Sequence, residues 1–313
     1  MIFIIYHNKY IMNINNYGYS FNLLEIENNI LIKKAKNIEG SNKIKNEINF
    51  YKFIIDNNIN FPIPEIYNLD NSNNIIKMKY LKDYKDLTNI FNENYELIQN
   101  IILNLNSLHK YTKIITKQEY LTNLKLEIYD KIVYRYNKTD WNNLNNFKSI
   151  KTINNVEVKN LSYYLNIINN KILNIINNND KYEFCLIHGD THLGNILINN
   201  KDLRFIDPRG YFGNSKLYGI KEYDYAKLLF GISGYSIFDQ MDVKKLDISN
   251  NNIQITFIEQ YCKIYEYDIF NKYTKLLSLT IWLGNNSSFI NNEKKITSLM
   301  IALYLCEKYL SML

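Results

Sequence analysis

Three polar residues in the second half of the chain have the types and the spacing of a phosphoryl-transfer site: Asp190, Asn195 and Asp207. Phosphoryl transfer needs a carboxylate that orients the attacking hydroxyl and accepts its proton, and it needs hard oxygen ligands for the magnesium that neutralises the phosphates. Asp190 is the candidate base. Asn195 follows five residues later and can turn back into the same pocket as a metal ligand, and Asp207 supplies a charged ligand.

Short apolar segments are expected to position these residues. The segments are bounded by Gly, Asn and Asp, which is typical of short strands joined by turns. Asp190 and Asn195 then lie on a loop between two strands, and Asp207 lies at the end of a third. Loops held by a buried scaffold are common places for chemistry. The segments are Phe184–Ile187, Ile196–Ile198 and Leu203–Ile206.

The motif His-Gly-Asp-x-His-x-x-Asn-Ile-Leu at His188–Leu197, followed by Phe-Ile-Asp at Phe205–Asp207, resembles the signature of the aminoglycoside phosphotransferase and choline kinase family. The close match is confined to residues 185–209, and weaker features in kinase order extend it over most of the chain. The resemblance implies an α+β, bilobal, protein-kinase-like fold that binds Mg²⁺ and ATP or another NTP. It places a small antiparallel-sheet lobe at residues 1–81 and a larger, mainly helical catalytic and substrate-binding lobe at 82–313.

Residues 1–80 are expected to form the strand-rich lobe. The resemblance assigns the phosphate-binding lysine to Lys33, with Lys34 as the alternative, because neighbouring residues of a strand point to opposite faces and only one can serve. Apolar residues at helical spacing predict a helix at Asn42–Asp56. The resemblance pairs Glu47 on this helix with the lysine, although Glu47 could also be a solvated charge. The expected strands are Ile2–Tyr6, Tyr19–Ile26 and Ile30–Ala35.

Two prolines in Phe61–Tyr67 predict a rigid, extended entry to another strand. The resemblance makes Ile75–Leu81 the last strand of the small lobe and the hinge. Met78 and Tyr80 are expected beside the nucleotide there, where backbone groups rather than side chains recognise the base.

The rest of the chain is expected to be mainly helical, with a less certain connection at Phe147–Glu157. In the resembled kinases the helices before the catalytic loop help to shape the acceptor site. The predicted helical segments are Asp86–Asp140, Val158–Ile176, Glu222–Leu229, Ile253–Tyr267, Phe270–Leu283 and Lys295–Leu310.

Four further residues have supporting roles with open alternatives. The resemblance implies that Asp224 accepts hydrogen bonds from the catalytic-loop backbone, but Asp224 could also be an acid favoured by the helix macrodipole. Arg209 could contact substrate or phosphate, or form a structural ion pair. His188 and His192 are expected to orient the loop. The alternative is a metal hydrolase in which both histidines, Asp190 and Asp207 surround a transition metal.

The sequence departs from protein kinases in three places. Pro208-Arg209-Gly210 replaces the Phe-Gly that follows the metal-binding Asp there, no Ala-Pro-Glu closes an activation segment, and no Gly-x-Gly-x-x-Gly occurs around Gly18. A surface for an extended protein substrate is therefore not evident. The predicted acceptor is a hydroxyl of a small molecule: an amino alcohol, a sugar or sugar derivative, or an aminoglycoside-like compound. A non-catalytic nucleotide-binding or scaffold protein and, third, a protein kinase are the alternatives.

The composition of the chain limits the classes of partner that are expected. The chain has 313 residues, 46% of them hydrophobic, and a formal charge of +6. Its enrichment in Asn, Ile, Lys and Tyr fits A/T-rich codons, and no basic stripe with interleaved aromatics predicts a nucleic-acid partner. Its Asn-rich patches are expected in loops or at helix ends. No apolar run approaches the ~20 residues that span a bilayer, and Met1–Tyr6 lacks the features of a signal peptide.

We therefore expect a cytoplasmic protein with no membrane or nucleic-acid partner, and the sequence leaves the oligomeric state open. The three cysteines have no Cys-x-x-Cys spacing and are expected to be buried thiols: Cys185, Cys262 and Cys306.

Overall fold

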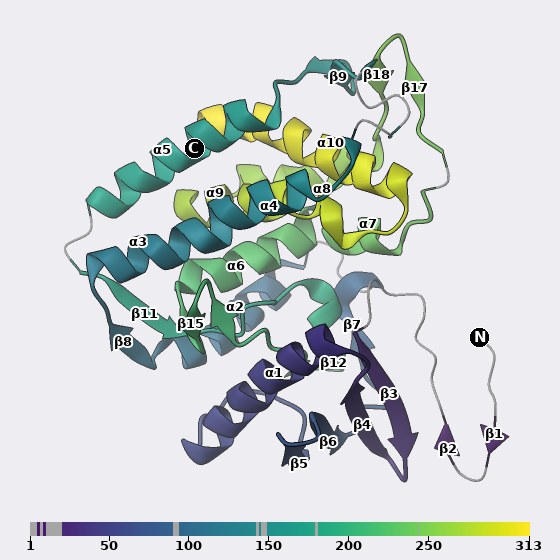
Figure 1. Cartoon of the computed structure of the whole chain (residues 1–313), viewed down its shortest axis with the longest axis vertical. Coiled ribbons are helices and arrows are strands. Elements are labelled where there is room, and N and C mark those ends of the chain that lie inside the picture. The colour runs from purple at the N-terminus through teal and green to yellow at the C-terminus, as the bar shows by residue number, and fades with distance from the viewer. Residues whose placement is uncertain are drawn as a thin grey trace. The chain divides into compact units, whose positions relative to one another are not determined.

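The computed structural model describes residues 21–89, 94–141, 144, 149–178, 181–243 and 245–313, together with the backbone of 5–6 and 9–10. The chain divides into two compact units (Figure 1). The first comprises Met1–Lys113 and Cys185–Asp224, and the second comprises Ile114–Phe184 and Tyr225–Leu313. Every residue proposed above for the site belongs to the first unit. The lobe boundary at residue 81 stays a prediction.

A six-stranded antiparallel sheet forms the start of the first unit, in the order β1-β2-β3-β4-β6-β5. Asn28 and Asn29 connect β3 to β4 with φ angles of 49° and 64°. Two consecutive left-handed residues suit the right-handed twist of a two-residue hairpin, and Asn tolerates this conformation better than most side chains. The strands are β1 (Ile5–Tyr6), β2 (Lys9–Tyr10), β3 (Asn22–Glu27), β4 (Ile30–Ala35), β5 (Ile66–Asp70) and β6 (Ile75–Lys79).

Helix α1 (Ile38–Asp56) packs on this sheet and contacts β4, β5 and β6 (Figure 1). It begins four residues before the predicted start, because the side chain of Asn37 accepts a hydrogen bond from the backbone of Gly40 and caps the helix. Gly40 is required there, since a Cβ atom would lie 2.3 Å from the carbonyl oxygen of Phe21. The loop around Gly18 lies outside the described residues.

The chain after the first sheet corrects the prediction of a helix from Asp86. Asp86 lies instead in strand β7 (Lys85–Asp86), opposite Leu197 of β12. Its carboxylate then accepts a hydrogen bond from the backbone of Thr88, which turns the chain into the short 3-10 helix η1 (Leu87–Asn89). Helix α2 (Tyr95–His109) follows. Ile90 and Phe91, included in the predicted helix, lie outside the described residues.

The strands predicted around the motif are present. Strands β12 (Ile196–Asn199) and β13 (Asp202–Phe205) form a hairpin to which β7 adds. Strand β11 (Glu183–Leu186) pairs with β16 (Tyr218–Gly219), and its sheet also contains β8 (Thr112–Ile114). A small hairpin of β14 (Tyr211–Phe212) and β15 (Ser215–Lys216) lies between β13 and β16 along the chain.

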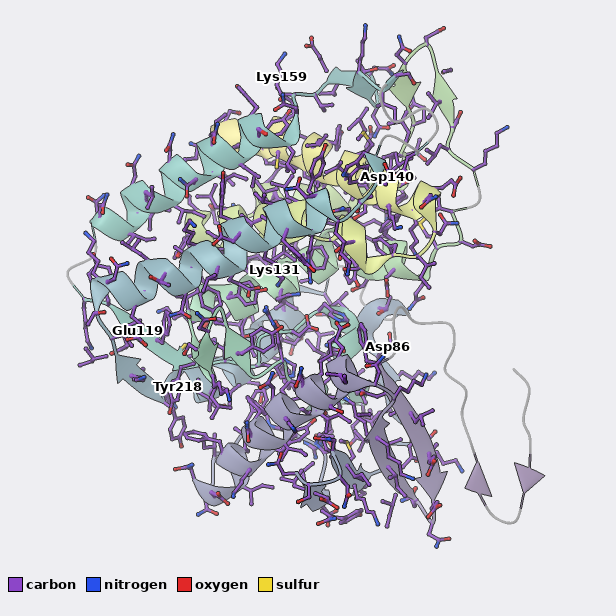
Figure 2. All side chains as sticks on the ribbon, in the orientation of Figure 1. Asp86, Glu119, Lys131, Asp140, Lys159 and Tyr218 are labelled. Atoms are coloured by element: carbon purple, nitrogen blue, oxygen red, sulfur yellow. The ribbon has the colours of Figure 1, made fainter. Side chains whose placement is uncertain are left out.

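Helices dominate the second unit, as expected. Helices α5, α9 and α10 contact one another (Figure 1). A near-continuous helix runs from α3 through a π-helical turn to α4, and Glu119 and Lys131 mark its course in Figure 2. The elements are α3 (Lys117–Lys125), η2 (Leu126–Asp130), α4 (Lys131–Asn137), α5 (Leu161–Asn177), η6 (Gly231–Tyr235), α7 (Ser236–Gln240), α8 (Phe257–Tyr261), η7 (Cys262–Glu266), α9 (Lys272–Leu283), η8 (Asn286–Ser288), α10 (Asn292–Tyr309) and η9 (Leu310–Met312), with α6 (Lys221–Phe230) beginning in the first unit.

A four-stranded sheet in the second unit was not predicted. Its order is β10-β9-β18-β17, and each of its two hairpins turns on an Asn-Asn pair with positive φ, at residues 154–155 and 250–251. The Asn-rich patch at 250–252 therefore forms a turn and the first residue of β18, whereas most of the patch at 142–146 lies outside the described residues. The strands are β9 (Thr152–Ile153), β10 (Val156–Glu157), β17 (Ile248–Ser249) and β18 (Asn252–Ile253).

Two predictions made from the composition concern the cysteines and membrane-spanning helices. The three cysteines are buried and free, as predicted. Among the helices that the structure describes, none has the length and apolar character needed to cross a bilayer.

Candidate active site

Lys33 lies at the centre of a buried cluster of charges. Its side chain is 6% exposed, and its Nζ atom lies 2.6 Å from Oε2 of Glu47 on α1 and 2.7 Å from Oδ1 of Asp207. Lys34 points to the other face of the strand, where it pairs with Glu25 at 2.8 Å and is 36% exposed. The structure thus places Lys33, rather than Lys34, beside both acids.

The electrostatics of this cluster depend on burial. Burial alone lowers the pKa of the Lys33 ammonium, but the carboxylates of Asp207 and Glu47 outweigh it and raise the pKa above its ordinary value. Burial raises the pKa of Glu47 to about 7, against the opposing effect of Lys33. Lys33 is therefore a fixed positive charge, and Glu47 is a carboxylate that depends on its lysine partner.

Asp207 follows β13 in an uncommon conformation. Its φ is +56°, and its side chain is 51% exposed. The next turn packs against α1: Gly210 has a φ of +64°, and a Cβ atom there would lie 2.8 Å from the carbonyl oxygen of Asn46. Only glycine fits this approach without a shift of backbone. The loop that carries Asp207 is thus held against the helix turn that carries Glu47.

Asp190 and Asn195 share one short loop. The side-chain nitrogen of Asn195 donates a hydrogen bond to the backbone carbonyl of Asp190 at 2.8 Å, which directs the amide oxygen of Asn195 away from that carbonyl as a potential metal ligand. The backbone carbonyl of Asn195 accepts a hydrogen bond from Ile206 at 3.0 Å, next to Asp207. Asn195 is buried, whereas the side chain of Asp190 is 32% exposed. The loop leaves the Asp190 carboxylate accessible to a substrate.

The two loop histidines have different surroundings. His188 is fully buried among the rings of Phe50, Phe61 and Phe205, at centroid distances of 5.9, 6.5 and 6.0 Å. Its Nδ1 atom accepts a hydrogen bond from the backbone of Asp190, and burial lowers its pKa. His192 accepts a hydrogen bond from the backbone of Gly194 at 3.2 Å, with its Nε2 4.0 Å from Oδ2 of Asp190. Both histidines orient the loop through backbone contacts.

Asp224 anchors the same loop from the start of α6. Its carboxylate is fully buried and accepts hydrogen bonds from the backbone N–H groups of His188 at 3.0 Å and Gly189 at 2.6 Å. The hydroxyl of Thr191 donates to the backbone carbonyl of Asp224. Asp224 therefore holds the loop backbone before Asp190 through its carboxylate, and it contacts the side chain of Thr191 after Asp190 through its own backbone carbonyl.

Arg209 makes contacts of a structural kind. Its Nη1 atom donates a hydrogen bond to the hydroxyl of Tyr223 at 2.8 Å, and its guanidinium stacks on Tyr211 at 3.8 Å from the ring centroid. Its backbone N–H donates to the carbonyl of His188 at 2.8 Å. These contacts join the loop after Asp207 to the loop that carries Asp190 and to the start of α6.

The predicted hinge residues lie at the end of β6. Met78 is buried and pairs with Leu31 of β4. The backbone N–H of Tyr80 donates to the carbonyl of Asn29 at 3.0 Å, and that of Lys79 donates to Glu65 at 2.8 Å. These two donors are already used, so a nucleotide base at this position would need the carbonyl groups or the next residues along the chain.

The donor set fits magnesium better than a transition metal. Asn195 and Asp207 offer side-chain oxygen ligands from two segments that the Asn195–Ile206 backbone hydrogen bond joins, and magnesium commonly binds one or two protein ligands while keeping several waters. Among the described residues, no group of three or more His, Cys, Asp and Glu side chains is arranged to hold a metal ion. Nδ1 of His188 accepts a hydrogen bond, so in the neutral ring the other nitrogen carries the proton and offers no lone pair to a metal, which disfavours the hydrolase arrangement.

Two long-range contacts near the site were not predicted from the sequence. His109, the last residue of α2, lies 3.0 Å from Oδ2 of Asp224. Tyr84 donates a hydrogen bond to Asp202, which also pairs with Arg204 at 2.9 Å, and so links the segment after β6 to the β12–β13 hairpin. No local pattern indicates either contact, because each joins residues far apart in the sequence.

Neither a protein-family model nor a curated protein matches the sequence. Solved structures do match it. A choline/ethanolamine kinase family protein from Mesorhizobium loti aligns with a TM-score of 0.55 and 8% identity over 94% of this chain and 87% of that chain. Choline kinase LicA from Streptococcus pneumoniae aligns with a TM-score of 0.55 and 12% identity over 93% and 92%. The GDP complex of aminoglycoside 2'-phosphotransferase-IIIa aligns with a TM-score of 0.51 and 14% identity over 96% and 93%.

These alignments span nearly the whole of each chain, and at 8 to 14% identity they bear on architecture. They confirm the predicted fold class, α+β and kinase-like. The chain has the protein-kinase-like fold that choline kinases and aminoglycoside phosphotransferases share.

Proposed function

We propose that the protein is a small-molecule kinase that transfers the γ-phosphate of ATP, with Mg²⁺, to a hydroxyl group of its substrate. The observation that carries this proposal is the pairing of buried Lys33 with both Glu47 and Asp207, in the same unit as the loop of Asp190 and Asn195. A lysine braced by a helix carboxylate, a metal-binding Asp and a loop Asp–Asn pair are the parts that kinases use.

Each residue has a distinct task. Asp190 orients the acceptor hydroxyl and takes its proton while the oxygen attacks the γ-phosphorus, and the bond to the β-phosphate oxygen breaks. Lys33 binds the phosphates, and Glu47 holds the lysine in place. Asn195 and Asp207 would hold Mg²⁺, which supplies charge neutralisation for the phosphates. Met78 and Tyr80 would border the base.

The surroundings of the loop have a supporting part. Asp224 and Arg209 fix the backbone immediately before Asp190, because both bond to the backbone of His188 and Asp224 also bonds to that of Gly189. His188 packs against the ring of Phe50, and His192 accepts a hydrogen bond from the backbone of Gly194 within the loop. A carboxylate that is one-third exposed but has a backbone tethered at several points is suited to meet a substrate in one orientation.

A small acceptor is favoured over a protein substrate by the segment after Asp207. Residues 211–219 form the short strands β14, β15 and β16 within the first unit, and Phe212 is fully buried. This leaves no long loop in the segment to hold an extended peptide. The solved structures that match include choline kinases and aminoglycoside phosphotransferases. The proposed acceptors are therefore amino alcohols, sugars, sugar derivatives and aminoglycoside-like compounds.

ATP is the proposed phosphate donor, and GTP is the alternative. One matching structure is described as LicA in complex with AMP, and another as an aminoglycoside phosphotransferase in complex with GDP. We also propose that the enzyme is cytoplasmic and that its partner is a small hydroxyl compound and not a nucleic acid or a membrane.

An acceptor screen tests this function. The purified protein, ATP and Mg²⁺ are incubated with panels of amino alcohols, sugars, sugar derivatives and aminoglycosides, and ADP formation is measured together with the mass of the acceptor. Acceptor-dependent ADP formation with a product heavier by one phosphate supports the proposal. If the protein binds nucleotide but turns over no acceptor of any panel, with either ATP or GTP, the non-catalytic alternative is favoured. Transfer to generic protein substrates alone would favour a protein kinase.

A further inference from the structure

Tyr51 is a buried tyrosine of α1 to which the proposed mechanism gives no task. It follows Glu47 by four residues, so the two side chains lie one turn apart on the same face of the helix. Tyr51 is fully buried, and its ring packs edge-to-face against Phe50 at a centroid distance of 6.0 Å. Its hydroxyl oxygen and Oε1 of Glu47 are both buried, and among the described residues neither has a hydrogen bond of normal length and angle.

A buried tyrosine hydroxyl usually has a hydrogen-bond partner, because burying it without one costs free energy. The hydroxyl of Tyr51 faces the carboxylate of Glu47, to which it can donate, and the backbone N–H of Asp207, from which it can accept. Burial raises the pKa of Tyr51, and the carboxylates of Glu47 and Asp207 raise it further. The hydroxyl therefore lies beside two partners without being fully bonded to either.

The contacts of Lys33 define the arrangement in which the hydroxyl is not fully bonded. The Nζ atom of Lys33 holds Oε2 of Glu47 at 2.6 Å and Oδ1 of Asp207 at 2.7 Å. The proposed function requires another arrangement, in which Asp207 directs its carboxylate to the metal and Lys33 contacts the phosphates. The side chain of Asp207 then no longer ties its loop to Lys33.

The backbone of Asp207 needs a separate restraint in that second arrangement. Its φ of +56° is uncommon for a residue other than glycine. The loop lies against α1 at the turn of Glu47, since a Cβ atom on Gly210 would come within 2.8 Å of the carbonyl oxygen of Asn46. Tyr51 is on this helix, and its hydroxyl faces the N–H group of Asp207 itself.

We propose that Tyr51 is a positioning residue whose hydroxyl accepts a hydrogen bond from the backbone N–H of Asp207 and donates one to Oε1 of Glu47 when Asp207 turns from Lys33 to the metal. The hydroxyl then fixes the backbone of Asp207 while its side chain changes partner, and it keeps Glu47 directed at Lys33. This inference rests on the proposed function, because only a phosphate-binding lysine and a metal-binding Asp207 require the change of partner.

The experiment removes the hydroxyl alone, by Tyr51→Phe. Tyr265→Phe is the matched control, because Tyr265 is a buried tyrosine of the second unit whose hydroxyl forms a normal hydrogen bond of 2.7 Å with Ser278. Thermal unfolding is measured without ligand. Binding of the non-hydrolysable analogue β,γ-imido-ATP is measured by titration calorimetry with and without Mg²⁺.

We expect the two variants to change in opposite ways. Tyr51→Phe should unfold at or above the wild-type Tm, because it removes a buried hydroxyl that has no full hydrogen bond, but it should bind the analogue about fivefold more weakly in the presence of Mg²⁺. Its binding without Mg²⁺ should match the wild type, since Asp207 then stays with Lys33. Tyr265→Phe should lower the Tm, because it leaves Ser278 without its partner, and should keep the wild-type affinity.

Hydrogen–deuterium exchange in peptides spanning residues 203–212 gives a second readout that does not depend on turnover. In the wild type, the analogue with Mg²⁺ should slow exchange of the Asp207 amide about tenfold, because its N–H gains a full hydrogen bond. In Tyr51→Phe the same addition should change that rate by less than about twofold, because the acceptor is absent.

Wild-type affinity for the analogue with Mg²⁺ in Tyr51→Phe would overturn the inference. A Tm as low as that of Tyr265→Phe, or a failure of Tyr51→Phe to fold, would also overturn it, because the hydroxyl would then have a purely structural role. If the wild-type protein does not bind the analogue with Mg²⁺, the proposed function fails and the inference fails with it. If the wild type and Tyr51→Phe bind it equally, only the inference fails.

Discussion

Replacing Lys33 by Met should destabilise the protein strongly and in a pH-dependent way. The ammonium of Lys33 and Oε2 of Glu47 are 2.6 Å apart, and both side chains are nearly fully buried. At an effective dielectric constant of about 20 the attraction is about 6 kcal/mol before desolvation is counted. Removing one partner of such a buried pair typically costs about 3–5 kcal/mol. Asp207 contributes less than about 1 kcal/mol, because its side chain is half exposed.

The pH dependence follows from Glu47. Its pKa is raised from 4.5 to about 7 in the folded protein. For an acid with a raised folded pKa, stability is greatest below the unfolded pKa and falls as pH rises through the folded one. Lys33 opposes this rise, so the pKa of Glu47 is higher still in the Lys33→Met variant. The stability of that variant therefore continues to fall up to a higher pH than the stability of the wild-type protein does. We expect a cost of about 1–2 kcal/mol at pH 5, where Glu47 is protonated, and about 3–5 kcal/mol at pH 8.5.

Urea unfolding followed by circular dichroism at the two pH values measures this difference. Lys34→Met is the control, since Lys34 is the next residue of the strand and its partner Glu25 is partly exposed, and it should cost less than about 1 kcal/mol at either pH. Adding Glu47→Gln to Lys33→Met should recover part of the loss at pH 8.5, because no buried charge is left alone. A Lys33→Met variant that matches Lys34→Met at pH 8.5 would refute this account of the cluster.

Three further predictions follow from the structure. Gly210→Ala should lower the free energy of unfolding by about 1–3 kcal/mol and raise the Mg²⁺ concentration needed for half-maximal turnover, because the new Cβ meets the carbonyl of Asn46 and displaces the Asp207 loop; wild-type Mg²⁺ dependence would contradict this. Asn195→Ala should raise the same Mg²⁺ requirement and leave nucleotide binding without metal unchanged, as measured by titration calorimetry. Asn29→Val should destabilise the β3–β4 hairpin by about 1–2 kcal/mol, since a β-branched residue resists the left-handed φ of 64°, whereas Asn29→Gly should be neutral or stabilising in the same thermal melts.

The order of elements around the motif could be predicted, because short apolar segments bounded by Gly, Asn and Asp have few alternatives to strands. This pattern predicted the strands β11, β12 and β13. Apolar residues at helical spacing predicted the helix that carries Glu47. The start of that helix was placed too late, since the apolar periodicity does not show the cap that Asn37 provides. Asp86 was misplaced for a related reason: its strand exists only because β12, far away in sequence, pairs with it.

Prediction of the site residues was limited in the same way, because their contacts join segments that are far apart in the sequence. Alternation along β4 indicated that only Lys33 or Lys34 could face the acids, but the choice depends on which face of the sheet α1 covers. Asp224 could be proposed because the resembled kinases have an Asp at the start of the corresponding helix. His109 could not, because a lone histidine at a helix end has no local feature that points to a carboxylate so distant in sequence.

The role of Asp190 is the central claim, and one comparison tests it most directly. Asp190→Asn and the control Asp202→Asn, a change at the opposite end of the β12–β13 hairpin, are assayed for phosphate transfer to the best acceptor and for ATP binding. We expect Asp190→Asn to lose at least about 100-fold in kcat while its ATP affinity stays near wild type, and Asp202→Asn to retain turnover. Near-normal turnover in Asp190→Asn would contradict the assignment of Asp190 as the base.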